Sequence, residues 1–374
     1  MIKKSLLIIL VFALLVTVSS FGVFAQKEKE RDYYYWDEIE TAEEMEFIRD
    51  IVRNDAVPIT VEVEEKIEIA LIFPAEDLSD SWQRAYVAVD ERLDELQIPY
   101  EIITMGSSHD NHILQRTHLE RALVEKYDYV IVGPTEIYIQ KDILEDLIKD
   151  PDIQVIIWNF TTPLMDWGKT RAEGQPLAYV GFDHYDGGTV LGKYILKTYD
   201  FKNVAYIYGV PGSTSIMRGH TVRDMLEAAG INTVYETYCD WDQIKAYEAA
   251  KQIVTAYPEV DHIHVISTDM AIGTANALEE MGMTGKIVVN GWGGTAREQE
   301  LLLDGKLDFT VLRNQDDEGV SQAEIIKLDL EGRRDEIPIV FNGEMALIDR
   351  SWKRADIDKL LEYANRYSSK YEIK

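Results

Sequence analysis

The chain has 374 residues, of which 46% are hydrophobic and 28% are charged, a composition typical of a globular protein and not of a disordered one. At ~150 residues per domain this length allows two domains and a large buried core. The formal net charge of −29 disfavours binding to nucleic acid or to anionic lipid, because an acidic surface repels both kinds of phosphate.

The first predicted element is a secretory signal peptide over residues 1–25. Lys3 and Lys4 precede an apolar run from 6 to 18, and Ala25 provides a small residue at the cleavage position. An uncleaved membrane anchor is the alternative, but the apolar run is short for ~30 Å of hydrocarbon. The single cysteine, Cys239, excludes an intramolecular disulfide. We therefore expect a protein exported through a cleaved signal peptide to a bacterial periplasm.

Residues 26–65 form a predicted N-terminal extension, which carries an aromatic cluster at 33–36. This cluster is expected to pack against a lobe, and contact with a partner is the alternative. From residue 66 strands and helices alternate. Predicted strands cover 67–73, 100–105, 129–133, 155–159, 204–209, 233–238, 262–266, 286–290 and 309–312. Predicted helices cover 81–96, 113–125, 141–149, 188–199, 218–229, 242–257, 271–281, a short segment to 303, 316–330 and 353–367.

This alternation predicts an α/β fold of two doubly wound, parallel-sheet lobes joined by crossover strands. The expected N-terminal lobe comprises residues 66–180 and 313–338. The expected C-terminal lobe comprises residues 181–312 and 339–350, and a C-terminal helix covers 351–374. In such folds ligands bind in the crevice at the carboxyl ends of the strands.

Polar and aromatic side chains recur at these strand ends. They are Ser79, Trp82, Asn159, Arg218, Thr268, Asp269, Trp292 and Arg313. Taken alone, each tryptophan is more commonly a core residue and each arginine a surface residue. Together, two indole faces can stack on a sugar-like ring while the amide, hydroxyl and carboxyl groups bind its hydroxyls. Two arginines in one cleft would repel each other unless an anionic or strongly polar ligand lay between them.

Six ordered segments carry a family resemblance over nearly the whole mature chain. They are Ser-Asp-Ser-Trp at 79–82, Asn-Phe-Thr-Thr-Pro at 159–163, Tyr-Val-Gly-Phe-Asp-His at 179–184, Ser-Thr-Asp at 267–269, Asn-Gly-Trp-Gly-Gly at 290–294 and Asp-Phe-Thr-Val-Leu-Arg at 308–313. The shorter segments occur across sugar-binding relatives, whereas the ordered set with both arginines is more specific. On these residues the chain resembles the autoinducer-2-binding periplasmic proteins of the LuxP type, and the resemblance implies the type I periplasmic binding protein architecture for the two lobes.

The resemblance implies a furanosyl borate diester as ligand, a quorum-sensing signal with one negative charge. By motif position, Arg218 and Arg313 would flank the borate. Ser79, Trp82, Asn159, Thr268, Asp269 and Trp292 would contact the furanosyl part, and the expected partner is the periplasmic domain of a membrane sensor histidine kinase. One position departs from the family, because Asp77 replaces a glutamine. A carboxylate there would repel a borate by ~4 kcal/mol at about 4 Å and an effective dielectric of about 20. Three alternatives therefore stay open: a nearby arginine offsets the repulsion, Asp77 points away from the ligand, or the ligand is a neutral relative.

The sequence gives little support for metal binding, cofactor binding or catalysis. The pairs His109/His112 and His262/His264 lack carboxylate or cysteine partners at metal spacing, so we expect neither a metal nor a cofactor. No catalytic constellation can be assembled, and we expect a protein without enzymatic activity; a secreted carbohydrate-active enzyme would need a positioned carboxylate pair. The main alternative function is the sugar-binding component of an ABC importer, with a permease as partner.

Overall fold

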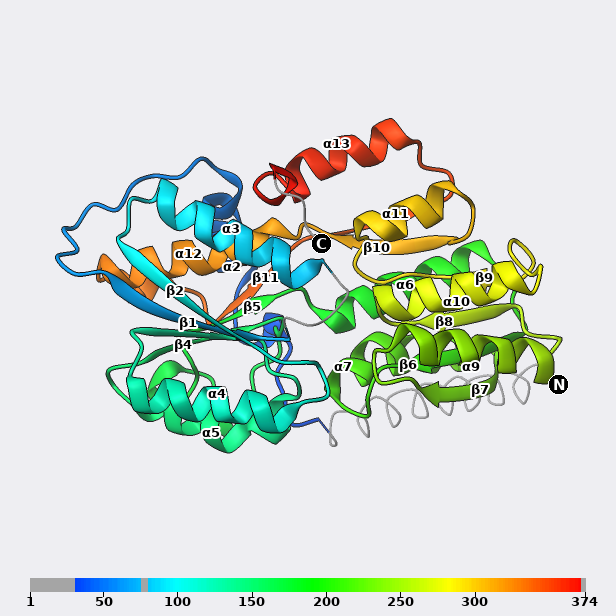
Figure 1. Cartoon of the computed structure of the whole chain (residues 1–374), viewed down its shortest axis with the longest axis horizontal. Helices are drawn as coiled ribbons and strands as arrows, with labels where there is room; N and C mark the ends of the chain where they lie inside the picture. Colours follow the sequence, from blue (N-terminus) through cyan, green and yellow to red (C-terminus); the bar gives the residue numbers. More distant parts are fainter. Residues whose placement is uncertain (1–30, 75–79, 371–374) are drawn as a thin grey trace, which may run out of the picture.

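The computed structural model describes residues 31–74 and 80–370, which form two α/β lobes lying side by side (Figure 1). The predicted signal peptide, Asp77 and Ser79 lie outside the described residues. The predicted fold class is confirmed, because each lobe is built on a mainly parallel sheet covered by helices.

The first lobe contains a six-stranded parallel sheet in the order β11-β5-β4-β3-β1-β2. Its strands are β1 (Ile67–Phe73), β2 (Tyr100–Gly106), β3 (Tyr129–Val132), β4 (Gln154–Trp158), β5 (Ala178–Gly181) and β11 (Val340–Asn342). Its helices are α2 (Ala42–Arg53), α3 (Ser81–Glu95), α4 (His112–Glu125), α5 (Ile137–Lys149) and α12 (Asp316–Leu330).

Both faces of this sheet are buried, which explains why β1 is almost continuously apolar. Ile69 and Leu71 of β1 belong to the core shared with α3, α12 and α2. Ala70 and Ile72 point to the opposite core, shared with α4 and α5. Successive side chains of a strand alternate between faces, so the strand needs an apolar residue at every position.

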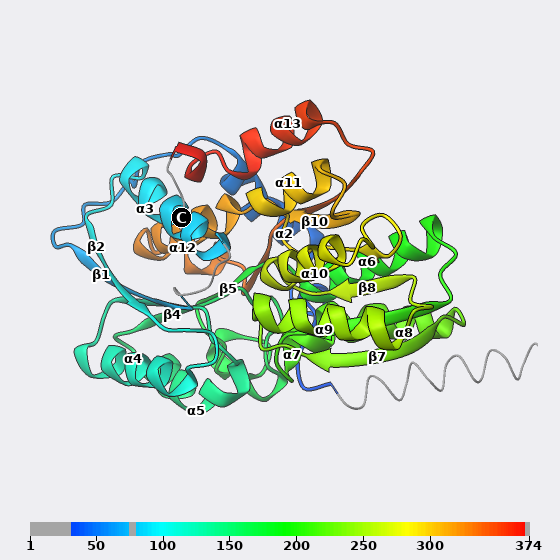
Figure 2. The ribbon, with the colours of Figure 1, turned by 45° about the vertical axis from the view of Figure 1, so that its right-hand side comes forward.

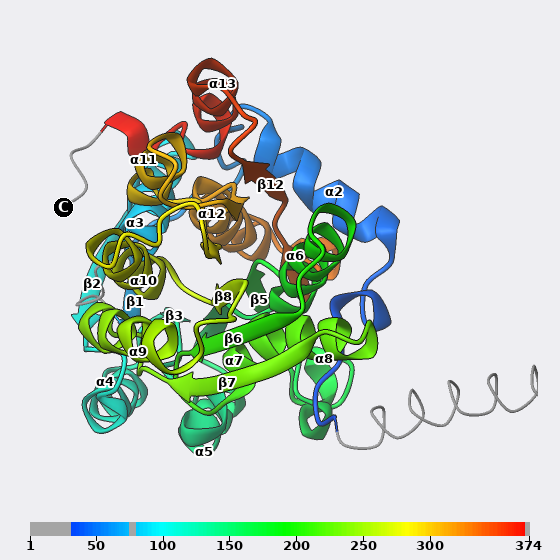
Figure 3. The same ribbon diagram turned by 90° about the vertical axis from the view of Figure 1, so that its right-hand side faces the viewer.

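The second lobe contains the parallel strands β7-β6-β8-β9, and β10 pairs with β12 in antiparallel orientation. Its strands are β6 (Asn203–Tyr208), β7 (Asn232–Tyr238), β8 (His262–Val265), β9 (Val288–Val289), β10 (Phe309–Arg313) and β12 (Met345–Asp349). Its helices are α6 (His184–Thr198), α7 (Ser213–Ser215), α8 (Thr221–Ala228), α9 (Gln243–Ala256), α10 (Thr268–Glu280), α11 (Ala296–Leu303) and α13 (Arg354–Ala364). Figure 3 shows β6, β7 and β8 between α9 and α10 on one side and α6 and α8 on the other.

The short turns are the 3₁₀ segments η1 (Trp36–Glu38), η2 (Met165–Trp167), η3 (Arg171–Glu173), η5 (Arg334–Glu336) and η6 (Ser368–Lys370), and the π turn η4 (Ile216–His220). The chain passes between the lobes after β5, after β10 and after β11. Beyond α13 it returns to the first lobe, where η6 contacts α3 (Figure 2).

Two expected boundaries need correction. Residues 339–350 were assigned to the second lobe, but β11 pairs with β5 of the first lobe, and only β12 joins the second. The helix expected to open at Arg218 begins instead at Ser213 and passes through a π turn, so Arg218 lies inside the helical segment. The pattern of apolar residues could not reveal this start, because Gly212 and Ser213 carry no apolar periodicity.

The N-terminal extension packs along the first lobe. Met45, Ile48 and Val52 of α2 are buried in the core beside α12. The expected packing of the aromatic cluster is also observed: Tyr35 lies against Tyr185 of α6, with ring centroids 4.7 Å apart. The indole nitrogen of Trp36 donates a hydrogen bond to Asp186 at 3.2 Å, so the extension touches both lobes.

Candidate functional site

A cavity with an empty volume of about 790 Å³, part of it open to solvent, lies between the lobes. Both lobes supply its walls. Its lining residues are Ser81, Trp82, His109, Pro134, Thr135, Glu136, Asn159, Phe160, Val210, Gly212, Thr214, Ser215, Arg218, Trp241, Ser267, Thr268, Asp269, Trp292, Arg313 and Glu318.

The structure brings seven of the nine predicted site residues to this cavity. They are Trp82, Asn159, Arg218, Thr268, Asp269, Trp292 and Arg313. Asp77 and Ser79 lie outside the described residues, so neither can be placed on its wall. The carboxyl ends of the strands meet at the cavity, which explains the convergence. These residues follow β1, β4, β8 and β9, end β10, or lie within the helical segment after β6. Their contact with a ligand remains a proposal.

Asn159 lies directly after β4 in the left-handed backbone region, with φ of 64°. Asparagine tolerates this region better than most residues with a side chain. Its backbone N–H donates to the carbonyl of Val180 at 2.7 Å, which fixes the residue between β4 and β5. Its buried Oδ1 accepts no hydrogen bond from the described residues, so it can accept one from a ligand.

Arg218 is held in the π turn after β6, a local irregularity common at functional sites. Its Nη1 donates to the carbonyl of Ile266 at 3.2 Å, and its Nη2 lies 3.2 Å from Nε2 of His184. Burial, together with the charges of Arg218 and Arg313, holds the pKa of His184 well below its usual value. The neutral imidazole can therefore accept from the guanidinium.

Arg313 ends β10 at the passage between the lobes. Its Nη2 donates to Oγ of Ser81 at 2.7 Å, and Ser81 donates onward to Oε1 of Gln315 at 2.8 Å. Burial lowers the pKa of Arg313, and the charge of Glu318 opposes that shift. The Nε of both Arg218 and Arg313 has no hydrogen-bond partner among the described residues. Each cation thus keeps donor capacity for a ligand.

The loop after β9 is fixed by Glu298. Its carboxylate accepts the backbone N–H of Trp292 at 3.0 Å and of Gly294 at 2.9 Å, and the hydroxyl of Thr310 at 2.7 Å. Burial raises the pKa of Glu298, and these hydrogen bonds oppose the shift. Thr268 completes the loop's support by donating to the carbonyl of Trp292 at 3.1 Å. Trp292 is thereby positioned under the Arg218 guanidinium, whose carbon lies 4.8 Å from the ring centroid.

Sequence reasoning missed several residues of the cavity wall. Trp241 belongs to the loop between β7 and α9, with φ of 61°, and its ring lies where a side chain at position 209 would be, so Gly209 is required. His109 lies against Trp241 with centroids 5.4 Å apart and brings the two lobes together at the cavity. Glu136 and Glu318 also line the cavity and were not among the predicted site residues. For Trp241 the sequence did offer a signal, because this tryptophan directly precedes Asp242, the N-cap of α9.

The described part of the chain offers neither a metal site nor a membrane-spanning helix. Between residues 31 and 370, apart from the 75–79 gap, no group of three or more His, Cys, Asp or Glu side chains could hold a metal ion. No helix in the same ranges is long and apolar enough to span a bilayer.

Two lobes with crossing strands and a polar cavity between them define a ligand-binding protein of the hinged, two-lobed class. A sequence profile of the periplasmic binding protein domain matches residues 69–334, and the chain belongs to that family. The family consists of solute receptors without enzymatic activity.

Similar proteins are named for a sugar or were solved with one. The chain is 22% identical over 240 residues to the ribose import binding protein RbsB of Escherichia coli K12, covering 64% of this chain and 77% of that protein. It is 28% identical over 183 residues to the D-allose-binding periplasmic protein of the same organism, covering 48% of this chain and 58% of that protein. An ABC transporter solute binding protein from Agrobacterium vitis, solved with bound D-fucose, superposes with a TM-score of 0.69 at 20% identity, over 78% of this chain and 97% of that one.

Proposed function

We propose that this protein is an exported periplasmic receptor that closes around one neutral, sugar-like ligand and delivers it to the permease of an ABC importer. The observation that carries the proposal is the cavity between the lobes, where aromatic faces and polar groups of both lobes meet. A ligand closes hinged lobes only through its higher affinity for the closed form, and residues from both lobes supply that difference.

The relatives support a sugar as the ligand class. The curated relatives are named for ribose and D-allose, and solved neighbours carry D-fucose or, in the Bacillus halodurans protein with a TM-score of 0.66, myo-inositol. All four are neutral polyhydroxy compounds. The side chains of Asn159, Thr268 and Asp269 offer the hydrogen bonds that such hydroxyl groups need.

The direct test is calorimetric titration of the mature protein with D-ribose, D-allose, D-fucose and myo-inositol. We expect at least one of them to bind with one ligand per chain and with a raised melting temperature. Failure of every neutral sugar to bind would refute the proposal. Deletion of the chromosomal gene and a growth test on the bound sugar would then examine the transport role.

A second candidate is reception of autoinducer-2, as a furanosyl borate diester or a close relative, with relay to a sensor histidine kinase. The specific observation favouring it is that Arg218 and Arg313 line the same cavity. Asp269 and Glu318 line the cavity as well, and their carboxylates would repel a borate anion. Boron-11 NMR and thermal shift with the autoinducer precursor, with and without borate, separate the candidates. Borate-dependent stabilisation that is lost in Arg218→Ala and Arg313→Ala would support the second one.

A further inference from the structure

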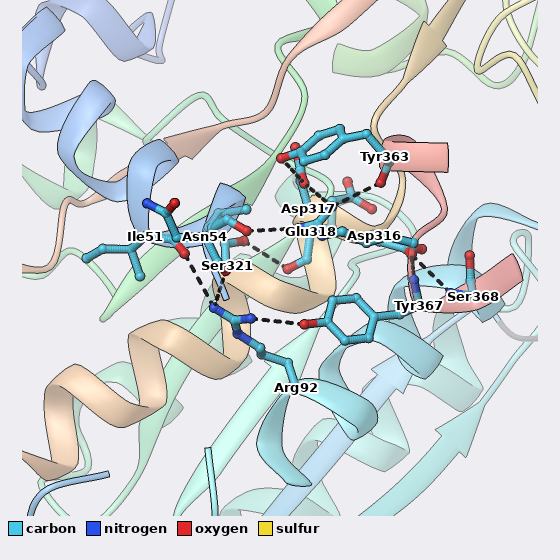
Figure 4. A network of polar contacts seen from close by, with 12 residues as sticks. Ile51, Asn54, Arg92, Asp316, Asp317, Glu318, Ser321, Tyr363, Tyr367 and Ser368 are labelled. Atoms are coloured by element: carbon cyan, nitrogen blue, oxygen red, sulfur yellow. Dashed lines mark hydrogen bonds and ion pairs between the residues drawn. The ribbon is translucent and has the colours of Figure 1, made fainter. Parts of the chain in front are cut away.

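Helix α12 begins with three consecutive buried carboxylates, Asp316, Asp317 and Glu318. The first two hold the C-terminal segment, as Figure 4 shows. Asp316 accepts the backbone N–H groups of Tyr367 at 2.6 Å and of Ser368 at 3.0 Å. These contacts give Asp316 a structural role.

Asp316 keeps its buried Oδ1 without a hydrogen-bond partner among the described residues, whereas Asp317 is satisfied within the protein. It accepts the hydroxyl of Tyr363 at 2.9 Å and a guanidinium N–H of Arg366 at 2.8 Å. Both partners belong to the segment that leads from α13 back to the first lobe. The two aspartates therefore account for the return of the chain, and neither lines the cavity.

Glu318 differs from its neighbours because it lines the cavity. Its side chain is buried, and its Oε2 accepts the indole N–H of Trp158 at 3.1 Å. Its Oε1 has no hydrogen-bond partner among the described residues, and none of their Arg, Lys or His nitrogens makes an ion pair with it within 4.0 Å. One oxygen is thus fixed by the protein and the other is left for a partner from the cavity.

An unsatisfied buried carboxylate oxygen is costly, and native proteins rarely keep one without a role. Burial raises the pKa of Glu318 to about 7, and the charge of Arg313 is the largest influence opposing that shift. A ligand hydroxyl that donates to Oε1 would satisfy this oxygen. An anionic ligand would instead repel the carboxylate.

We infer that Glu318 contacts the ligand and selects a neutral polyhydroxy ring over an anionic one. This inference rests on the proposed function and names its substrate class. The charges on the cavity wall agree with it, because Arg218 and Arg313 are accompanied by three acids, Glu136, Asp269 and Glu318. The two arginines therefore need no anion between them.

The test compares matched neutral and anionic ligands on the full mature chain at pH 8, by calorimetric titration. D-Fucose and D-galactose are paired with D-galacturonate, and D-ribose is paired with D-ribose 5-phosphate. The variant is Glu318→Gln, which keeps an acceptor for Trp158 and removes the charge. The control is Asp317→Asn, the same chemical change one residue away and outside the cavity. Circular dichroism checks folding, and Glu318→Leu provides a second variant.

We expect the wild-type chain to prefer the neutral member of a pair. Glu318→Gln should weaken its binding about tenfold and reduce the neutral-over-anionic preference by about tenfold or more, since a hydrogen bond to a charged group is lost and a repulsion removed. Asp317→Asn should leave that preference unchanged. Equal wild-type affinity for both members, or affinities within twofold of wild type in both Glu318 variants, would overturn the inference while the receptor function stands. Absence of any sugar binding by the wild-type chain would overturn the proposed function itself.

Discussion

Buried arginines occur in two regions of this molecule, and their surroundings differ. In the first lobe, Arg92 is 1% exposed, and each of its three nitrogens has a partner; Figure 4 shows the contacts with Tyr367 and Asn54. Its Nε donates to Glu324 at 2.8 Å, its Nη1 to the hydroxyl of Tyr367 at 2.9 Å and its Nη2 to the carbonyl of Asn54 at 3.0 Å. In the cavity, Arg218 and Arg313 are almost as deeply buried, but each keeps an unpartnered Nε among the described residues.

The difference separates a structural cation from one available to a ligand. Arg92 has a counterion in contact, because Glu324 lies 2.6 Å from its Nη2. No acid of the described residues forms an ion pair with Arg218 or Arg313. A protein buries a charge without a contacting counterion only where another group compensates it. In the cavity, nearby acids supply part of that compensation and a bound ligand can supply the remaining hydrogen bonds.

The largest expected effect is on stability, from Arg92→Met. This change leaves Glu324 buried without its cation, so the free energy of unfolding should fall by about 3–5 kcal/mol. Urea denaturation followed by circular dichroism measures it. Adding Glu324→Leu should restore a large part of the loss, because the second buried charge is then removed as well. A loss below about 1 kcal/mol would show that the network of Arg92 is not structural.

Arg313→Met should change ligand affinity strongly and stability little, the reverse of what is expected for Arg92→Met. The variant loses one hydrogen bond to Ser81 but also a buried charge, so the free energy of unfolding should change by less than about 1 kcal/mol. Ligand affinity should fall by about ten- to a hundredfold, the value of a hydrogen bond to a charged group. Calorimetric titration and urea denaturation of the same preparation measure both. A loss of stability as large as that of Arg92→Met would remove the distinction between the two regions.

The sequence predicts the alternation of elements well, because buried parallel strands require an apolar residue at nearly every position, as in β1. It also predicts which strand ends converge, since topology fixes that. The sequence selects Arg218 as a site residue, but it cannot show that Arg92, on a predicted helix, is also buried and fully hydrogen-bonded. Their difference arises from a distant partner: Glu324 is 232 positions away from Arg92.

The same limit explains the missed residues of the cavity. Glu318 follows two further acids, and only the fold decides that Asp316 and Asp317 face the C-terminal segment while Glu318 faces the cavity. Trp241 depends on a left-handed turn and on the absence of a side chain at Gly209. Interactions of this kind join segments that are far apart in the sequence, where local patterns carry no information.

A smaller effect is expected where the lobes meet at the cavity edge. A Cβ at Gly212 of the second lobe would lie 2.2 Å from Oε2 of Glu136 of the first lobe, although the backbone at 212 is extended and accepts any residue. Gly212→Ala should therefore disfavour closure and weaken ligand binding about tenfold, with little change in the unfolding midpoint. In a Glu136→Ala background the same substitution should have no further effect. An equal effect in both backgrounds would mean that this contact does not act on closure.

The smallest effect is expected from Trp36→Phe. The indole N–H of Trp36 has a partner in the other lobe, and the substitution tests whether this hydrogen bond contributes to stability alone, as those of Arg92 are expected to do. The indole of Trp36 donates to Asp186 beside the first passage between the lobes, and the contact is only partly buried. Loss of such a bond should lower the free energy of unfolding by about 0.5–1 kcal/mol. Ligand affinity should stay within twofold, because neighbours of a hinge move little relative to each other during closure. A tenfold change in affinity, measured by the same titration, would instead show that the N-terminal extension takes part in closure. The presence of a hydrogen-bond partner within the protein would then no longer distinguish structural groups from ligand-binding ones.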